Sequence, residues 1–174
     1  RIEMTPLPAR WEQMAAADVD AIAAVADVVH PAFPEDRAVL AERFALCPEG
    51  CFVLRQGRDG AVIGYTLTHP WAADSVPPLN TLLGRLPPEG AARVYYIHDL
   101  ALLPAARGMQ AGAAAVRLLE ARARAAGLAT MALVAVNNSG GFWRARGFAP
   151  VDSPHWQQKL ASYGADAAYM TKVL

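Results

Sequence analysis

The stretch that decides the fold is residues 95–127, YYIHDLALLPAARGMQAGAAAVRLLEARARAAG. It predicts a buried strand, a short loop and a long Ala-rich helix, in that order. The unpaired N–H groups at the start of such a helix, together with the helix dipole, can bind a phosphate or pyrophosphate. Gly108 and Gly112 have no side chain, so the backbone can approach such an anion closely. The sequence therefore predicts an anion site at the start of this helix.

The flanking residues predict further helices and strands, alternating along the chain. Strands are expected over 10–14, 51–56, 61–68, 130–136, 148–151 and 169–174, and helices over 18–29, 34–46 and 140–146. A turn at 57–60 joins the second and third strands into a hairpin. The proline-rich segment 69–92 is expected to be a long functional loop containing a short helix at 79–83. Residues 1–8 are expected to be a leader or an edge segment, and 155–166 have no clear pattern.

This order predicts an α/β (α+β) class, with helices on both faces of a mixed sheet. The 174 residues are expected to form a single domain, 1–174, with a full core. The net charge is zero, so no basic surplus favours a nucleic-acid partner. No apolar run is long enough to cross a bilayer, and no signal peptide is recognisable. The chain begins with Arg1, so a trimmed native start is expected, and we expect a cytoplasmic protein with no membrane partner.

The cysteines, Cys47 and Cys51, occur in the single motif CPEGC. This motif lacks the second ligand pair of a structural zinc site, and the histidines are scattered. We expect no metal site and ordinary thiols near a helix–strand turn.

Residues 104–112, PAARGMQAG, resemble the acyl-CoA signature of the GNAT superfamily of N-acyltransferases. Arg107, Gly108 and Gly112 match that signature, whereas Gln110 stands where the family normally has a glycine. Residues 142–148, FWRARGF, resemble the second landmark of the family, Tyr-x-x-x-Gly-Phe. The resemblance implies a GNAT-like three-layer α-β-α sandwich around a mixed, mostly antiparallel twisted sheet. It also implies acetyl-CoA as cosubstrate.

The resemblance also implies which residues bind coenzyme A. The pyrophosphate would lie on the backbone N–H groups after Arg107, and Gln110 would weaken this site without abolishing it. The pantetheine arm would add to the exposed edge of the central strand, as in β-augmentation, where that strand splays from 130–136. The implied cofactor-binding residues are Leu100, Ala101, Leu102, Arg107, Gly108, Met109, Gln110, Ala111, Gly112, Asn138 and Trp143.

His98 and Asp99 are polar residues in an otherwise apolar strand, and such residues need a partner or a task. A neutral imidazole is suited to accept the proton of an alkylammonium, whose pKa is about 10.4. In a regular strand His98 shares a face with Tyr96, Leu100 and Leu102, and Asp99 points the other way. A local bulge would swap the two. Either these residues are catalytic, as the resemblance implies for His98, or they are hydrogen-bonded core groups.

The general acid of the family, a tyrosine, corresponds to Trp143, whose indole cannot release a proton at useful pH. Core packing beside Phe142 and Phe148 is the favoured role for Trp143. Ser139 or a water is expected to hydrogen-bond the departing sulfur instead, although Asn137, Asn138 and Ser139 are equally suited to turn and N-cap roles.

The acceptor pocket is expected to be bordered by loop residues, namely His30, Phe33, His69 and Trp71. The leading hypothesis is an enzyme that transfers an acetyl group to a primary amine of a small molecule. A catalytically degenerate acyl-CoA-binding sensor or scaffold is the alternative, because of Gln110 and Trp143. A protein-lysine acetyltransferase is a third option, but the acidic residues are dispersed. A homodimer is possible through edge strands near the C-terminus.

Overall fold

The computed structural model describes residues 8–174, so the expected leader or edge segment lies outside the described residues except for Pro8. Within them, a seven-stranded sheet has the order β1-β2-β3-β4-β5-β7-β6. Only the β4–β5 pair is parallel, and the other neighbours are antiparallel. The strands are β1 Ala9–Gln13, β2 Cys51–Gln56, β3 Ala61–Ala72, β4 Arg93–Leu102, β5 Thr130–Ala135, β6 Ala149–Pro150 and β7 Ala168–Val173.

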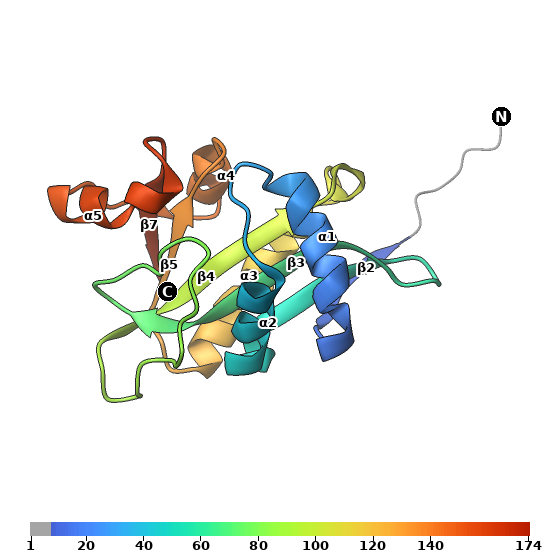
Figure 1. Ribbon diagram of the computed structural model, residues 1–174, viewed down its shortest axis with the longest axis horizontal. Coiled ribbons are helices and arrows are strands. Elements are labelled where there is room, and N and C mark those ends of the chain that lie inside the picture. The colour runs from blue at the N-terminus through green and yellow to red at the C-terminus, as the bar shows by residue number, and fades with distance from the viewer. Residues whose placement is uncertain (1–7) are drawn as a thin grey trace.

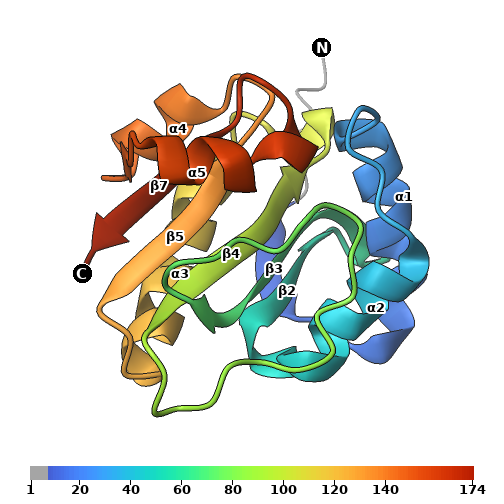
Figure 2. The same ribbon diagram turned by 60° about the vertical axis from the view of Figure 1, so that its left-hand side comes forward.

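Helices cover both faces of this sheet, as Figures 1 and 2 show, with α1 and α2 on one face and α3 on the other. The predicted three-layer α/β class with a mixed, mostly antiparallel sheet is therefore confirmed. The helices are α1 Val19–Val29, α2 Arg37–Leu46, α3 Ala111–Ala125, α4 Gly140–Ala145 and α5 Pro154–Lys159, with single 3-10 turns at Ala16–Asp18, Pro48–Gly50, Pro104–Ala106 and Ala161–Tyr163.

Each face of the sheet has its own apolar core. Leu119 and Ala123 of α3 pack with Tyr95 of β4 and Met131 of β5. On the opposite face, residues of α1 and α2 pack against β2 and β3, namely Ile22, Leu40, Val53, Tyr65 and Leu67. Burial of a side chain of this size contributes about 1.5–3 kcal/mol. The first core includes Tyr95 and Ile97 of β4 and the second includes Ala101, so β4 is packed on both faces.

Strand β3 is longer than the sequence predicts, because it continues beyond Thr68 to Ala72. Pro70 removes one backbone donor. However, the pairing of β3 with β2 extends only to Leu67, which lies opposite Cys51, the first residue of β2. From there on β3 needs only β4 as a partner, and a proline is tolerated on its free side. His69 and Trp71 therefore lie on a strand, and the prediction that they are loop residues is wrong.

The segment between β3 and β4 contains no helix at 79–83, contrary to prediction, because its prolines favour extended chain and turns. Side chains of α2 and of the loop before it hold the segment in place. The Leu83 N–H donates to Glu42 at 2.6 Å, and Arg43 donates to the Thr81 carbonyl at 3.0 Å. The segment thus lies against α2, next to the site described below.

No helix within residues 8–174 is both long and apolar enough to cross a membrane.

Candidate active site

A cavity opens where β4 and β5 separate. The two strands pair from Tyr95 and Met131 only as far as Ile97 and Leu133. Beyond this point β4 continues to Leu102 with no partner on that side, which confirms the predicted splaying. The resulting cavity has a volume of about 340 Å³ and reaches from α1 to Arg107 and α4. Its polar or charged lining side chains are Asp27, His30, Glu35, Tyr65, His98, Asp99, Arg107, Asn137, Ser139, Trp143 and Tyr163.

A bulge in β4 places both His98 and Asp99 at this cavity. Leu67 of β3 pairs with Asp99 and the next residue, Thr68, pairs with Ile97, so His98 is the extra residue. The inserted residue reverses the alternation of faces along the rest of the strand. Asp99 therefore lies on the same face as His98, whereas a regular strand would separate them.

The bulge also corrects the predicted face of the strand. Tyr96, before the bulge, packs on the face of β4 that carries His98. Leu100, after the bulge, packs with the core beneath α3 on the other face. The prediction that His98 shares a face with Leu100 and Leu102 is wrong, because it assumed a regular strand.

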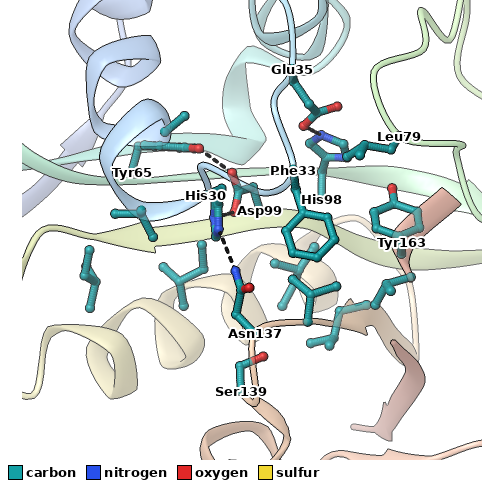
Figure 3. A pocket seen from close by; sticks show the side chains of 18 of the residues that line it. His30, Phe33, Glu35, Tyr65, Leu79, His98, Asp99, Asn137, Ser139 and Tyr163 are labelled. Atoms are coloured by element: carbon teal, nitrogen blue, oxygen red, sulfur yellow. Dashed lines mark hydrogen bonds and ion pairs between the residues drawn. The ribbon is translucent and has the colours of Figure 1, made fainter. Parts of the chain in front are cut away.

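His98 forms the first of two histidine–carboxylate pairs in the site (Figure 3). Its Nε2 lies 2.7 Å from Oε1 of Glu35, and the two side chains are 2% and 9% exposed. The other oxygen of Glu35 accepts a hydrogen bond from the Asn80 N–H at 3.2 Å. Nδ1 of His98 is buried without a hydrogen-bond partner among the described residues. Glu35 therefore fixes the ring and leaves Nδ1 as its available atom.

His30 and Asp99 form the second pair, with Nε2 of His30 2.7 Å from Oδ1 of Asp99. These side chains are 17% and 13% exposed, so this pair is more open than the first. The Tyr65 hydroxyl donates to the second oxygen of Asp99. Nδ1 of His30 lies 3.4 Å from Nδ2 of Asn137, just beyond β5. His30 thus bridges the two diverging strands (Figure 3).

Hydrogen bonds and nearby charges shift the pKa values of Asp99, His30 and Glu35. Burial alone would raise the pKa of Asp99, but hydrogen bonds from His30 and Tyr65 hold it below its usual value. Burial would lower the pKa of His30, but the bond to Asp99 and the charges of Asp99 and Glu35 hold it above its usual value. Burial would likewise raise the pKa of Glu35, but the hydrogen bond from His98 holds it below its usual value. Both carboxyl groups are therefore ionised near neutral pH.

The loop that leads into α3 reaches the cavity through Arg107, and its following residues have an unusual backbone. Gln110 is left-handed, with φ of 56°, and Gly108 has φ of 82°. The Ala114 N–H donates to the Gln110 carbonyl at 3.1 Å, so the amides just before it form the unpaired first turn of α3. Gln110 keeps a backbone conformation that favours glycine, although it carries a side chain.

Gly112 has a packing reason that the sequence does not reveal. A Cβ at this position would come within 3.0 Å of the Phe142 ring. The absence of a side chain therefore allows α4 to lie against α3, so close approach to an anion is not needed to explain this glycine.

The other predicted cofactor residues have varied surroundings. The side chains of Ala101 and Ala111 are buried, and that of Met109 packs with Ala111 away from the cavity. Only backbone groups of these residues remain to contact a ligand. Asn138 is exposed and does not line the cavity, where Asn137 lies instead. Trp143 is buried against Phe142 and Phe148, as its packing role predicts, and one side of it lines the cavity.

The acceptor-side predictions divide in the same way. His30 and Phe33 line the cavity, whereas His69 and Trp71 do not. His69 is buried behind His98, with ring centroids 6.4 Å apart. Burial lowers its pKa to about 3, so this ring stays neutral.

Sequence reasoning missed Glu35, Tyr65 and Tyr163 as members of the site. Glu35 was assigned to the first turn of a helix, but α2 begins at Arg37 with Asp36 as its N-cap. The motif His30-Pro31 and Pro34-Glu35 was a usable signal, since polar residues between prolines often mark a functional loop. Tyr65 offered no signal, because it lies within an apolar strand.

Among residues 8–174, no group of three or more His, Cys, Asp or Glu side chains could hold a metal ion. Cys47 and Cys51 are buried free thiols, and burial raises the pKa of each to about 12.

Comparison with known proteins identifies the class of protein that this fold and site define. The profile of the Acetyltransferase (GNAT) family matches residues 19–148. The chain therefore belongs to the GNAT acetyltransferase family, as the resemblance predicted.

Solved structures share the fold at low sequence identity. A GNAT-like decarboxylase, GphF, in complex with isobutyryl-CoA has a TM-score of 0.75 at 20% identity, over 94% of this chain and 98% of that chain. A chain of the NatC complex bound to Gag peptide and CoA has a TM-score of 0.74 at 15% identity, over 97% of this chain and 99% of that chain. The PaiA N-acetyltransferase of Thermoplasma acidophilum, in complex with coenzyme A, has a TM-score of 0.65 at 11% identity, over 97% of this chain and 100% of that chain. No curated protein matched the chain.

Proposed function

We propose that this protein transfers the acetyl group of acetyl-CoA to a primary amine of a small molecule. The observation that carries this proposal is the opening between β4 and β5. It has two histidine–carboxylate pairs in its lining, together with Arg107 of the loop that leads into α3. The cavity of about 340 Å³ is at the lower end of the range for small-molecule sites, which favours a small acceptor.

Coenzyme A would bind mainly through backbone groups. The amides of Gly108 to Gly112 would hold the pyrophosphate at the start of α3, with Arg107 beside them. The pantetheine arm would add to the free edge of β4 at residues 100–102, in the manner of an added strand. Asn138, Trp143 and Leu102 would complete this side, with Asn138 at its exposed rim.

The chemistry is direct attack of the amine on the thioester. An alkylamine arrives as an ammonium ion, so it must first lose a proton. His98 is the proposed base and accepts that proton at Nδ1, while Glu35 positions the ring. The amine nitrogen then attacks the thioester carbonyl, the carbon–sulfur bond breaks, and the sulfur leaves with its electron pair. Ser139, the N-cap residue of α4, would hydrogen-bond the sulfur.

The acceptor end is closed by apolar and phenolic side chains. Leu79, Phe33 and Tyr163 lie around His98, as Figure 3 shows, and the Tyr163 hydroxyl donates to the Pro77 carbonyl at 2.8 Å. Water would therefore be largely excluded once an amine is bound, which strengthens the electrostatic interactions around the reacting atoms.

The alternative function is an acyl-CoA-binding sensor or scaffold without turnover. It is favoured by the left-handed Gln110 in the anion loop and by Trp143 in place of an acidic hydroxyl. This alternative predicts binding of coenzyme A and no thiol release with any amine.

Thermal unfolding tests the cofactor site first, with acetyl-CoA, coenzyme A and adenosine as separate ligands. A ligand at a hundred times its Kd stabilises by about 2.7 kcal/mol, which corresponds to roughly 5 to 10 °C for a chain of this size. We expect this shift with both coenzyme A forms and none with adenosine. No shift at millimolar coenzyme A would contradict both functions.

An amine panel with detection of released thiol then separates the two functions. The proposed enzyme releases thiol with at least one small primary amine. Binding without release, across mono-, di- and aromatic amines, would favour the sensor.

A further inference from the structure

The proposed reaction requires two proton transfers at different places. The first takes a proton from the ammonium ion before attack. After attack, the nitrogen of the tetrahedral adduct carries a second proton that must leave, while the departing sulfur becomes a thiol. The balance is one ammonium ion and one thioester giving one amide, one thiol and one proton released to solvent. A single base at the amine accounts for the first transfer only.

The two histidine–carboxylate pairs occupy different places in the cavity. His98 and Glu35 lie beneath the loop 77–84, almost without exposure. His30 and Asp99 lie where β4 and β5 separate, with Asn137 and Ser139 on the other side of the opening (Figure 3). The second pair thus faces the part of the cavity that the proposed pantetheine slot enters.

We propose that His30 is a second catalytic residue, which donates a proton to the departing sulfur and takes one from the adduct nitrogen. Asp99 is its positioning residue, because it holds Nε2 and leaves Nδ1 as the exchanging atom. Within residues 8–174, the one hydrogen-bond contact of Nδ1 is the long 3.4 Å approach to Nδ2 of Asn137, which a ligand can replace. This role rests on the proposed function. His30 would be the general acid, a part that the indole of Trp143 cannot take.

Charged neighbours on each packed element favour a protonated His30. Asp99 comes from β4 and Glu35 from the loop between α1 and α2, and both raise the His30 pKa. Asp27 lies on α1, and Tyr65 of β3 holds Asp99. The other basic side chains that line the cavity are those of His98 and Arg107.

The test is the ratio of kcat for wild type and His30→Gln between pH 6 and 9.5, with saturating acetyl-CoA and amine. Dividing the two kcat values cancels any pH dependence that comes from His98, because both proteins contain this residue. A thiol of ordinary pKa, about 8.5, leaves as thiolate without help at high pH. We expect a ratio of about 10- to 100-fold at pH 6 that approaches one above pH 9. His155→Gln, an exposed histidine on α5, is the matched control and should give a ratio of one throughout.

A second measurement does not depend on turnover. Ring-nitrogen NMR should show His30 titrating above 6.5 in the wild type and at lower pH in Asp99→Asn. Retention of the coenzyme A thermal shift shows that both variants are folded.

Two outcomes would overturn the role of His30. One is a wild-type to His30→Gln ratio that is independent of pH or grows with pH, which would indicate a structural or basic role. The other is an unchanged His30 titration in Asp99→Asn. Absence of thiol release by the wild type with every amine would instead overturn the proposed function, and this role with it.

Discussion

The two ends of the cavity are built in different ways. At the acceptor end, charged side chains from the loop 30–36 meet the bulge of β4, and each histidine is held by a carboxylate. At the proposed cofactor end, Arg107 lines the cavity, and the side chains of residues 109–111 are exposed or packed away from it, so a ligand there would meet mainly main-chain groups. The first end depends on which side chains meet, and the second on the path of the main chain.

Under the proposed function, this difference would separate chemistry from binding. Substitutions at the proposed acceptor end should change proton transfer and leave the coenzyme A affinity nearly intact. Substitutions at the cofactor end that preserve the backbone should change affinity and leave kcat nearly intact. The following four experiments can break or sharpen this separation.

His98→Gln should have the largest effect. Loss of a general base typically costs 10²- to 10⁴-fold, so we expect a loss of this order in kcat with an unchanged Kd for coenzyme A. Steady-state kinetics and calorimetric titration measure the two quantities, and His155→Gln is the control. An equal loss of cofactor affinity would break the separation.

His69 shows what a buried histidine does without a carboxylate. Its pKa of about 3 lies below the unfolded value of about 6.5, so between these values the unfolded state binds a proton that the folded state does not. Stability therefore falls as pH falls from 6.5 towards 3, by on the order of 3 kcal/mol at pH 4.

The variant His69→Phe keeps the ring packing against Trp71 and Tyr96 and should lack this part of the pH dependence. Urea unfolding of both proteins at pH 4 and pH 7 measures the difference. Equal pH dependence in the two proteins would contradict the buried neutral state of His69.

Tyr65→Phe tests the hydrogen bond that supports Asp99. A hydrogen bond to a charged group contributes about 1.5–3 kcal/mol, so we expect a loss of this size in the free energy of unfolding at pH 7. The lowered pKa of Asp99 gives stability that is present above its unfolded value and is lost as pH falls through the folded value. The difference between wild type and variant should therefore shrink in acid.

Tyr95→Phe is the matched control for this experiment. Its hydroxyl lies 2.7 Å from Oγ1 of Thr68, a neutral partner, so its effect should not vary between pH 3 and 7. The same pH dependence in both variants would show that Asp99 is not the group that senses Tyr65.

Gln110→Gly should have the smallest effect. A left-handed residue with a side chain costs about 1–2 kcal/mol, partly offset by the greater unfolded-state entropy of glycine. We expect a gain of about 0.5–1 kcal/mol in stability, coenzyme A bound no more than a few-fold tighter, and an unchanged kcat. Gln110→Ala, which keeps the Cβ, should show neither gain, and a large change of kcat in either variant would contradict a binding role.

Local patterns predicted much of the fold. The Ala-rich helix predicted within residues 95–127 is observed as α3, because apolar periodicity and the glycine that follows the helix, Gly127, are local signals. Prediction failed at β3, where pairing with β4 overrides Pro70, and at 79–83, where side chains of α2 hold an extended loop. Of the residues expected to border an acceptor pocket, His30 and Phe33 line the cavity and His69 and Trp71 do not. Glu35 and Tyr65 were not predicted, because their partners are more than thirty residues away.

The class of the fold and the family could be predicted from the sequence alone, since both depend on patterns within short stretches of the chain. That His98 and Asp99 share a face follows only from the way the strands pair. A bulge depends on the register between β3 and β4, and a one-residue shift in register reverses the face of every following side chain. The tertiary structure also brings together the pairs His30–Asp99 and His98–Glu35, because the members of each pair are far apart in the sequence and meet only in the folded chain.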